Sequence, residues 1–198
     1  MATNVKNYTD KELLEKVKLT AGFNGIPPTK WLLGVRASTI IPNTFCDKVY
    51  LFEGENCLSV TSITTNPGSA GLIDYKKYQT DGIAVMADDN WYYDLWTPGL
   101  HKGKMRALVQ VGNVNYYRDN DGDKIAEEIG KIHTGVIGLN FHTASYNSDA
   151  KTVSSFVAPT VGTWSMGCQV CNVLSSYYKI LNLIGAQKRV SYCLIKEF

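Results

Sequence analysis

Cys168 and His142 are the two residues with the most suggestive chemistry in this sequence. A cysteine thiolate is a strong nucleophile, and a histidine beside it can take the thiol proton, so the pair can transfer an acyl group at an amide bond. Gly167 before the cysteine permits a tight turn, which would expose the thiol and bring backbone N–H groups beside it. We therefore predict Cys168 as the nucleophile and His142 as its general base.

The segment after Cys168 has the spacing of an amphipathic helix. From Gln169 to Ile184 apolar side chains recur every three or four residues, and Gly185 stands where a helix commonly ends. A helix that began at the cysteine would place partial positive charge beside the sulfur and favour the thiolate. The N–H groups from Met166 to Cys168 would then be available to bind an oxyanion.

His142 ends a stretch that alternates between apolar and polar side chains, as a half-buried β-strand does. Within residues 136–142, the apolar stripe consists of Ile137, Leu139 and Phe141, and the histidine falls on the opposite face. The pattern predicts a strand that carries His142 on its polar face.

The rest of the chain predicts a mainly β protein with a helical extension. Thr9 and Glu12 have the spacing of a helix start, and apolar residues at helical spacing follow them. From Trp31 the period changes to two, and turns rich in Pro, Gly and Asn separate short apolar runs. We expect strands at 31–35, 48–52, 57–63, 105–111, 113–118 and 189–198, with pairing of 113–118 and 105–111. Residues 82–93 predict either another strand pair or a segment that crosses one face of the protein. The expected organisation is a helical extension over residues 1–30 and a β-rich catalytic domain over residues 31–198.

Two stretches resemble the catalytic domain of the L,D-transpeptidase (YkuD-type) family. They are Val-Ile-Gly-Leu-Asn-Phe-His at 136–142 and Ser-Met-Gly-Cys at 165–168, followed by a predicted helix and a final strand. The family carries a histidine on a strand and then Ser/Thr-His-Gly-Cys, and Trp-Ser-x-Gly-Cys-Gln at 164–169 is most similar to a variant in phage-encoded relatives. Met166 stands where the family usually has histidine, so any role of that histidine in substrate binding is lost.

The resemblance implies a mostly β fold with a short helix after the catalytic cysteine. It also implies a triad in which the backbone carbonyl of Thr143 orients His142. The residues expected beside the oxyanion or the substrate are Gly167, Met166, Ser165, Trp164, Asn140 and His101. The substrate implied is the stem peptide of peptidoglycan, and we expect a monomer that needs no metal or cofactor. We expect hydrolysis, as in a phage endolysin-like peptidase, rather than the formation of cross-links.

Two alternatives stay open within the same resemblance. One is an L,D-transpeptidase proper, and the other is a non-catalytic module that binds the cell wall or is associated with a virion. Met166 in place of the motif histidine keeps the second alternative open. A module that has lost its activity is expected to have lost residues of the catalytic motif. Wall binding without bond cleavage would identify the non-catalytic module.

Three other motifs suggest different chemistry. Cys168 and Cys171 form a C-x-x-C pair, but a thioredoxin-like motif belongs near the start of a βαβ unit rather than late in a β-rich chain. Zinc would need a second close pair of ligands, and the other cysteines and histidines are scattered. The acidic stretch 119–123 resembles the start of a calcium loop, yet Lys124 and Gly130 replace the glycine and glutamate of an EF-hand. We therefore predict a solvated turn there and no metal site.

The composition, with 44% hydrophobic and 19% charged residues, is that of an ordinary globular protein. A formal net charge of +2 gives no basis for nucleic-acid binding, and no stretch predicts insertion into a membrane. The sequence shows no secretory signal, and its odd number of cysteines, five, argues against a complete set of disulfides. We expect a protein made in the cytoplasm that acts on the cell wall, in the host periplasm or wall if the protein is phage-encoded.

Overall fold

The alternating pattern that begins at Trp31 forms a closed β-barrel in the computed structural model, which describes residues 5–79, 81–146 and 156–198. The barrel strands are β1 (Lys30–Arg36), β2 (Asp47–Glu53), β3 (Asn56–Thr64), β5 (Asn90–His101), β6 (Met105–Gln110), β9 (Phe141–Thr143), β10 (Gln169–Cys171) and β11 (Val190–Lys196). They close in the order β1-β11-β5-β6-β9-β10-β3-β2. The protein is therefore mainly β, as the sequence predicts.

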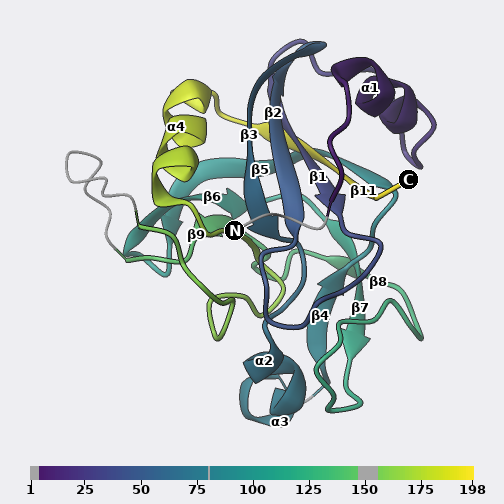
Figure 1. Ribbon diagram of the computed structural model, residues 1–198, viewed down its shortest axis with the longest axis vertical. Coiled ribbons are helices and arrows are strands. Elements are labelled where there is room, and N and C mark those ends of the chain that lie inside the picture. Colours follow the sequence, from purple (N-terminus) through teal and green to yellow (C-terminus); the bar gives the residue numbers. More distant parts are fainter. Residues whose placement is uncertain (1–4, 80, 147–155) are drawn as a thin grey trace.

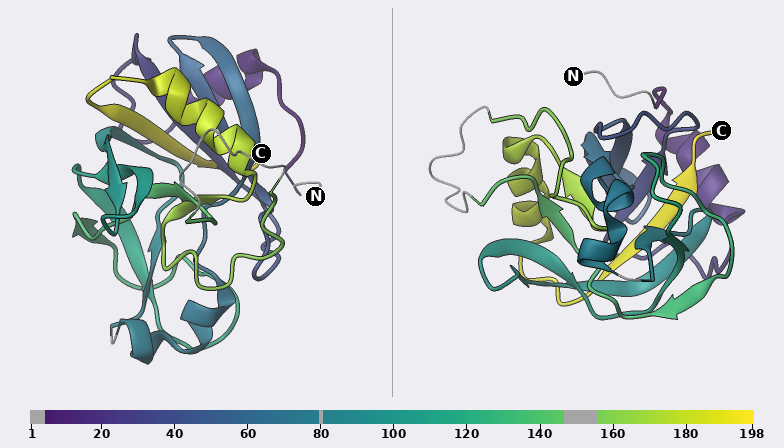
Figure 2. Two further views of the ribbon diagram at one scale, coloured as in Figure 1. Left: turned by 90° about the vertical axis from the view of Figure 1, so that its left-hand side faces the viewer. Right: turned by 90° about the horizontal axis from the view of Figure 1, so that it is seen from below.

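A second sheet and four helices complete the described structure. The sheet has the order β4-β7-β8 and consists of β4 (Ile83–Met86), β7 (Val114–Asp119) and β8 (His133–Gly135). The helices are α1 (Asp10–Lys18), α2 (Ser69–Ile73), α3 (Tyr75–Tyr78) and α4 (Leu174–Ile184). The short helices α2 and α3 lie at the end of the molecule opposite α1 and α4 (Figures 1 and 2).

Strands β1 and β11 join opposite ends of the sequence. They run parallel, with Trp31 opposite Ser191, and β11 also pairs with β5 on its other edge. Because neighbouring residues on β1 point to opposite sides, Leu32 packs inside the barrel while Trp31 packs outside it. The inner cluster also contains Tyr177 and Leu181, so α4 shares the core of the barrel.

Helix α1 covers the outer face of the barrel. The side chain of Thr9 accepts a hydrogen bond from the N–H of Glu12, and the Glu12 carboxylate accepts one from the N–H of Thr9, which is a capping box. The buried face of the helix, Leu13 and Val17 included, packs in one cluster with Trp31. Residues of the predicted extension and of the barrel thus share one apolar cluster.

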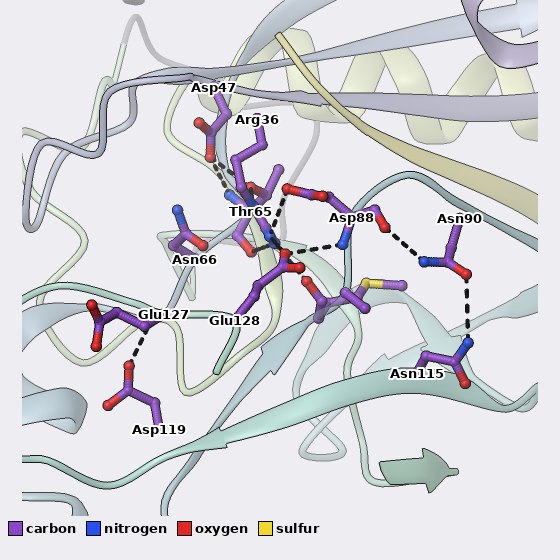
Figure 3. Close-up of polar contacts among 12 residues, drawn as sticks. Arg36, Asp47, Thr65, Asn66, Asp88, Asn90, Asn115, Asp119, Glu127 and Glu128 are labelled. Atoms are coloured by element: carbon purple, nitrogen blue, oxygen red, sulfur yellow. Dashed lines mark hydrogen bonds and ion pairs between the residues drawn. The ribbon is translucent and has the colours of Figure 1, made fainter. Parts of the chain in front are cut away.

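A buried ion-pair network ties β1 to the second sheet (Figure 3). Arg36 is 3% exposed, and its guanidinium donates hydrogen bonds to Thr65 Oγ1 at 2.9 Å and to the carbonyl of Met86 at 2.8 Å. The same group pairs with the carboxylates of Asp88 and Glu128. A buried guanidinium is stable only when its donors are satisfied in this way, so the network fixes the end of β4 against the barrel.

The expected pairing of 113–118 with 105–111 is wrong. The strand β7 forms, but it pairs with β4 and β8 in the second sheet, whereas β6 pairs with β5 and β9 in the barrel. The N–H groups of Val111 and Gly112 both bond to the carbonyl of Leu95, which ends β6 at this point and redirects the chain. Sequence proximity suggested a hairpin, and this turn back onto β5 separates the two strands into different sheets.

Candidate active site

Parallel pairing of β9 and β10 brings Cys168 and His142 together. Phe141 lies opposite Gln169 and His142 lies opposite Val170. The residues just before the two strands, Asn140 and Cys168, therefore lie beside each other. There the backbone N–H of Asn140 donates a hydrogen bond to Cys168 Sγ at 3.4 Å. A ring nitrogen of His142 and one of His101 lie with the sulfur in a group whose atoms are all within 4.8 Å of one another.

The helix predicted from Gln169 begins five residues later, at Leu174. Residues Gln169–Cys171 form β10 instead, a strand paired on both edges with β9 and β3. This tertiary pairing outweighs the helical spacing of the apolar residues. The predicted effect of a helix N-terminus on the sulfur is therefore wrong, because Cys168 precedes a strand.

The strand predicted at 136–142 is confirmed only at its end, where β9 covers Phe141–Thr143. Before it, Gly138 has a φ of 84°, a left-handed conformation that interrupts an extended strand. The Gln110 side chain takes the place of a neighbouring strand here, because its Oε1 accepts hydrogen bonds from the N–H groups of Ile137 and Leu139. The alternation in the sequence thus belongs to an irregular segment held by one buried amide.

His142 is 1% exposed and its tautomer is fixed by a neighbour. A carbonyl oxygen can only accept, so Nδ1 donates its proton to the carbonyl of Thr143 at 2.9 Å. The other nitrogen, Nε2, carries the lone pair and has no hydrogen-bond partner among the described residues. Burial lowers the pKa of His142 to about 3, with a further contribution from His101, so the imidazole is neutral at rest.

The thiol of Cys168 is also neutral at rest. Cys168 is 8% exposed, and burial raises its pKa above the ordinary value, although the Asn140 N–H and the charge of Lys102 act in the opposite direction. The Sγ lies 3.5 Å from the carbonyl oxygen of Gly138, to which the thiol proton donates. The resting pair is therefore a thiol and an imidazole rather than a thiolate and an imidazolium.

A hydrogen-bond relay fixes the proton on His101. The N–H of Gln110 donates to Asn140 Oδ1 at 2.9 Å, so the amide nitrogen Nδ2 of Asn140 faces His101 Nδ1, also at 2.9 Å. His101 Nδ1 must then accept, which places its proton on Nε2. The ring stacks on His142 with a centroid distance of 4.2 Å. His101 is therefore a neutral hydrogen-bond donor within the site.

The hydrogen-bond relay from Gln110 through Asn140 to His101 also affects whether the site can bind a metal ion. Two imidazoles and a thiol are donors that a zinc ion would accept, and here they lie close together. Coordination through His101 Nε2 would require its proton to move to Nδ1, where it would face the donating amide of Asn140. That conflict favours His101 as a donor to substrate over His101 as a metal ligand.

Ser165, Met166 and Gly167 form the turn that presents the thiol. Ser165 Oγ accepts from the N–H of Gly167 at 3.2 Å and donates to the carbonyl of Cys168 at 2.7 Å. Gly167 has a φ of 118°, and a Cβ there would lie 2.6 Å from the carbonyl oxygen of Ala84, so only glycine fits. Of the three N–H groups predicted to bind an oxyanion, that of Gly167 is already engaged. Those of Met166 and Cys168 donate no hydrogen bond to another described residue.

A cavity of about 470 Å³ opens above the sulfur. Its lining includes Met166, Trp164 and His101 as well as the cysteine. Lys102 and Arg118 are its charged residues, and no acidic side chain of the described residues lines it. The cavity therefore suits a ligand that carries negative charge.

Cys171 lies apart from this cavity. It is fully buried in the barrel core, whereas Cys168 packs in a separate apolar cluster, and both are free thiols. Because Gln169–Cys171 form the strand β10, Cys171 does not lie one helical turn from Cys168. Nothing in this arrangement supports a dithiol pair.

The sequence prediction missed Gln110, Lys102 and Arg118. Gln110 holds both Asn140 and the segment before β9, and the two cations line the cavity. A polar residue within the apolar run 105–111 was a signal for Gln110. Arg118 gave no signal, because it reaches the cavity from the second sheet.

Comparisons of the chain with protein-family models, curated proteins and solved structures find no match. No helix in the described ranges has the length and apolar character needed to cross a bilayer. The functional interpretation therefore depends on the geometry of the site and on the sequence resemblance.

Proposed function

We propose that this protein is a cysteine-dependent acyl-transfer enzyme in which Cys168 attacks an amide carbonyl and His142 is the general base. One observation carries the proposal. His142 Nδ1 is held by the carbonyl of Thr143, so the buried lone pair of Nε2, which belongs to the group that contains the sulfur, has no partner in the part of the chain that the structure describes. A buried unpaired nitrogen is costly to the fold, so its presence beside a thiol indicates a proton acceptor.

The neutral resting pair implies proton transfer during the attack. His142 would take the proton of Cys168 as the sulfur–carbon bond forms, and the imidazolium would be stabilised by the oxyanion that develops at the same time. The N–H groups of Met166 and Cys168 and the Nε2–H of His101 are neutral donors near that oxyanion. His142 would then protonate the leaving amine, and water would resolve the acyl-enzyme.

The stem peptide of peptidoglycan is the substrate that we propose. The resemblance of 136–142 and 165–168 to L,D-transpeptidases supports it, and the likeness to phage-encoded relatives favours hydrolysis over cross-linking. The charge of the cavity gives independent support, because stem peptides carry free carboxylates and the cavity presents Lys102 and Arg118. Trp164 and Met166 would contact the apolar parts of the peptide.

The test is digestion of purified sacculi by three proteins: the wild type, Cys168→Ala and the matched control Cys171→Ala. Muropeptides are separated and weighed, and new amino groups and new reducing sugar ends are counted. We expect new amines without new reducing ends from the wild type and from Cys171→Ala, and none from Cys168→Ala. An added amine that appears in the products would identify transpeptidation.

Two outcomes would count against the proposal. New reducing ends would indicate a glycosidase, which uses a pair of carboxylates rather than a thiol. An unchanged muropeptide profile, together with retention of the protein on the sacculi, would favour the non-catalytic binding module. The binding module remains a second candidate because Cys168 and His142 are both buried.

A further inference from the structure

Two cations line the cavity above Cys168, and neither has an acidic partner. Lys102 and Arg118 both belong to the lining, and neither forms a salt bridge with another described residue. Two cations around a hollow space give it a positive potential, which attracts an anionic ligand. Within the described lining, only Lys102 and Arg118 can neutralise the charge of such a ligand.

Lys102 lies at the reacting end of the cavity. It follows His101 in the turn between β5 and β6. Burial raises the pKa of the Cys168 thiol and lowers that of His142, and the charge of Lys102 lowers both. Arg118 is not among the charges that shift either pKa. The guanidinium of Arg118 therefore lies farther from the reacting atoms than the ammonium of Lys102.

Arg118 reaches the cavity from the second sheet, beside the turn that presents the thiol. It lies opposite Ala84 where β7 pairs with β4 (Figure 1). The carbonyl oxygen and the Cβ of Ala84 lie against Gly167, at 2.6 and 3.2 Å from the position that a Cβ of residue 167 would take. Directly opposed residues of an antiparallel pair have their side chains on the same face of the sheet. The side chain of Arg118 therefore leaves β7 on the face that packs against the turn before Cys168.

The guanidinium of Arg118 is held in place, yet most of its donors are available. One nitrogen donates a hydrogen bond to the carbonyl of Gly82 at 3.0 Å, and the group lies over the ring of Tyr116, 4.9 Å from its centroid. Gly82 is itself fixed, because it has a φ of 106° and a Cβ there would lie 2.6 Å from the carbonyl oxygen of Asp119. A guanidinium carries five N–H donors, and the others donate to no described residue. Such a fixed planar fork fits the two oxygens of a carboxylate.

We propose that Arg118 is the specificity-determining residue of this cavity and binds a free carboxylate of the substrate peptide. The inference rests on the proposed function, because it names the group that the enzyme recognises on its substrate. A guanidinium can form two parallel hydrogen bonds with a carboxylate, whereas an amide in the same place offers one acceptor oxygen and no negative charge. The substrates are therefore acidic peptides whose recognised carboxylate lies apart from the scissile amide. Peptides in which that carboxylate is amidated bind weakly.

Calorimetric titration tests this assignment with the full-length Cys168→Ala protein, which cannot turn over its ligand. The probes are pairs of synthetic stem peptides. The two members of each pair differ only in one carboxylate, which is free in one member and amidated in the other, and each carboxylate of the stem has its own pair. For one pair we expect the acid to bind about tenfold more tightly than the amide.

Two substitutions added to Cys168→Ala assign that preference to one side chain. Arg118→Gln removes the charge and should reduce the preference to less than about twofold. Lys104→Gln removes a charge from the same β5–β6 turn as Lys102 but outside the cavity lining, so it is the matched control and should keep the preference. Arg118→Lys retains a cation without the fork and should keep about a threefold preference.

Turnover gives a readout that a structural role of Arg118 would not produce. With Cys168 intact, Arg118→Gln should raise KM for the acid peptide about tenfold and change kcat less than about threefold. The constants for the amidated peptide should stay within about threefold of the wild type, whereas a damaged fold would impair both peptides alike. Salt provides a test that needs no substitution at residue 118, because raising it from about 0.02 to 0.5 M should weaken the preference.

Four outcomes would overturn the assignment of Arg118. They are equal binding of acid and amide in every pair, a preference that Arg118→Gln retains, a preference that salt leaves unchanged, and tighter binding of inorganic phosphate than of any acid peptide. Failure of the proposed function gives a different result. A preference that depends on Arg118 without any cleavage of the peptides would support the carboxylate site and refute acyl transfer. Cleavage that depends on Cys168 without any preference would do the reverse.

Discussion

Cys168 should react with iodoacetamide as a buried neutral thiol, at a rate that follows pH. An ordinary cysteine pKa of 9.0 gives about 1% thiolate at pH 7, and the raised pKa of Cys168 makes the fraction smaller still. His142, with a pKa of about 3, is protonated in only about one molecule in ten thousand at that pH, so it cannot stabilise a resting thiolate. The labelling rate should therefore rise about tenfold for each pH unit between about 6 and 9.

The assay is brief labelling at a series of pH values, followed by digestion and mass spectrometry of the cysteine peptides. Cys57, which is half-buried on β3, serves as an internal reference, and we expect it to be labelled faster than Cys168. A labelling rate for Cys168 that does not change between about pH 6 and 8 would demonstrate a thiolate–imidazolium pair. That result would refute the reasoning from burial.

Three further predictions concern stability. Gly167→Ala should lower the free energy of unfolding by more than about 2 kcal/mol and abolish activity, because the added Cβ would lie 2.6 Å from the Ala84 carbonyl oxygen. Urea unfolding measures the loss of stability, and the muropeptide assay measures the loss of activity. Arg36→Met should cost about 3–5 kcal/mol in urea unfolding, because it leaves the partly buried carboxylates of Asp88 and Glu128 without a cation. The folded pKa of Asp119, about 6, lies above its ordinary value of 3.8, so the protein should lose stability as the pH rises from about 4 to 6. Thermal unfolding over that range should show the loss in the wild type and not in Asp119→Asn.

Much of the barrel was predictable from the sequence because its longer strands have local signals. The apolar runs that begin at Trp31 and end near Lys196 alternate strongly, and turns rich in Gly and Pro separate them. The capping pair of Thr9 and Glu12 likewise marks the start of α1 from neighbouring residues alone. In these elements the local pattern and the tertiary packing favour the same structure.

The elements around the site were less predictable because partners distant in the sequence define them. β10 is a strand of three residues whose conformation depends on pairing with β9 and β3. The segment before His142 is shaped by Gln110, and the cavity is completed by Arg118 from the second sheet. The sequence could name Cys168 and His142, but the neutrality of the pair follows from burial, which no local pattern encodes.

The position of β11 between β1 and β5 has a consequence for synthesis of the protein on the ribosome. Trp31 is made early and its partner Ser191 late, so the barrel lacks the strand β11 until nearly the whole domain has been translated. Pairings that span such a separation form slowly, since a long loop must close before any contact is gained. Until then β1 and β5 have unpaired edges, which are sites for mispairing between nascent chains on one messenger RNA. We therefore expect the thiol and its histidine to be assembled only after β11 has been made.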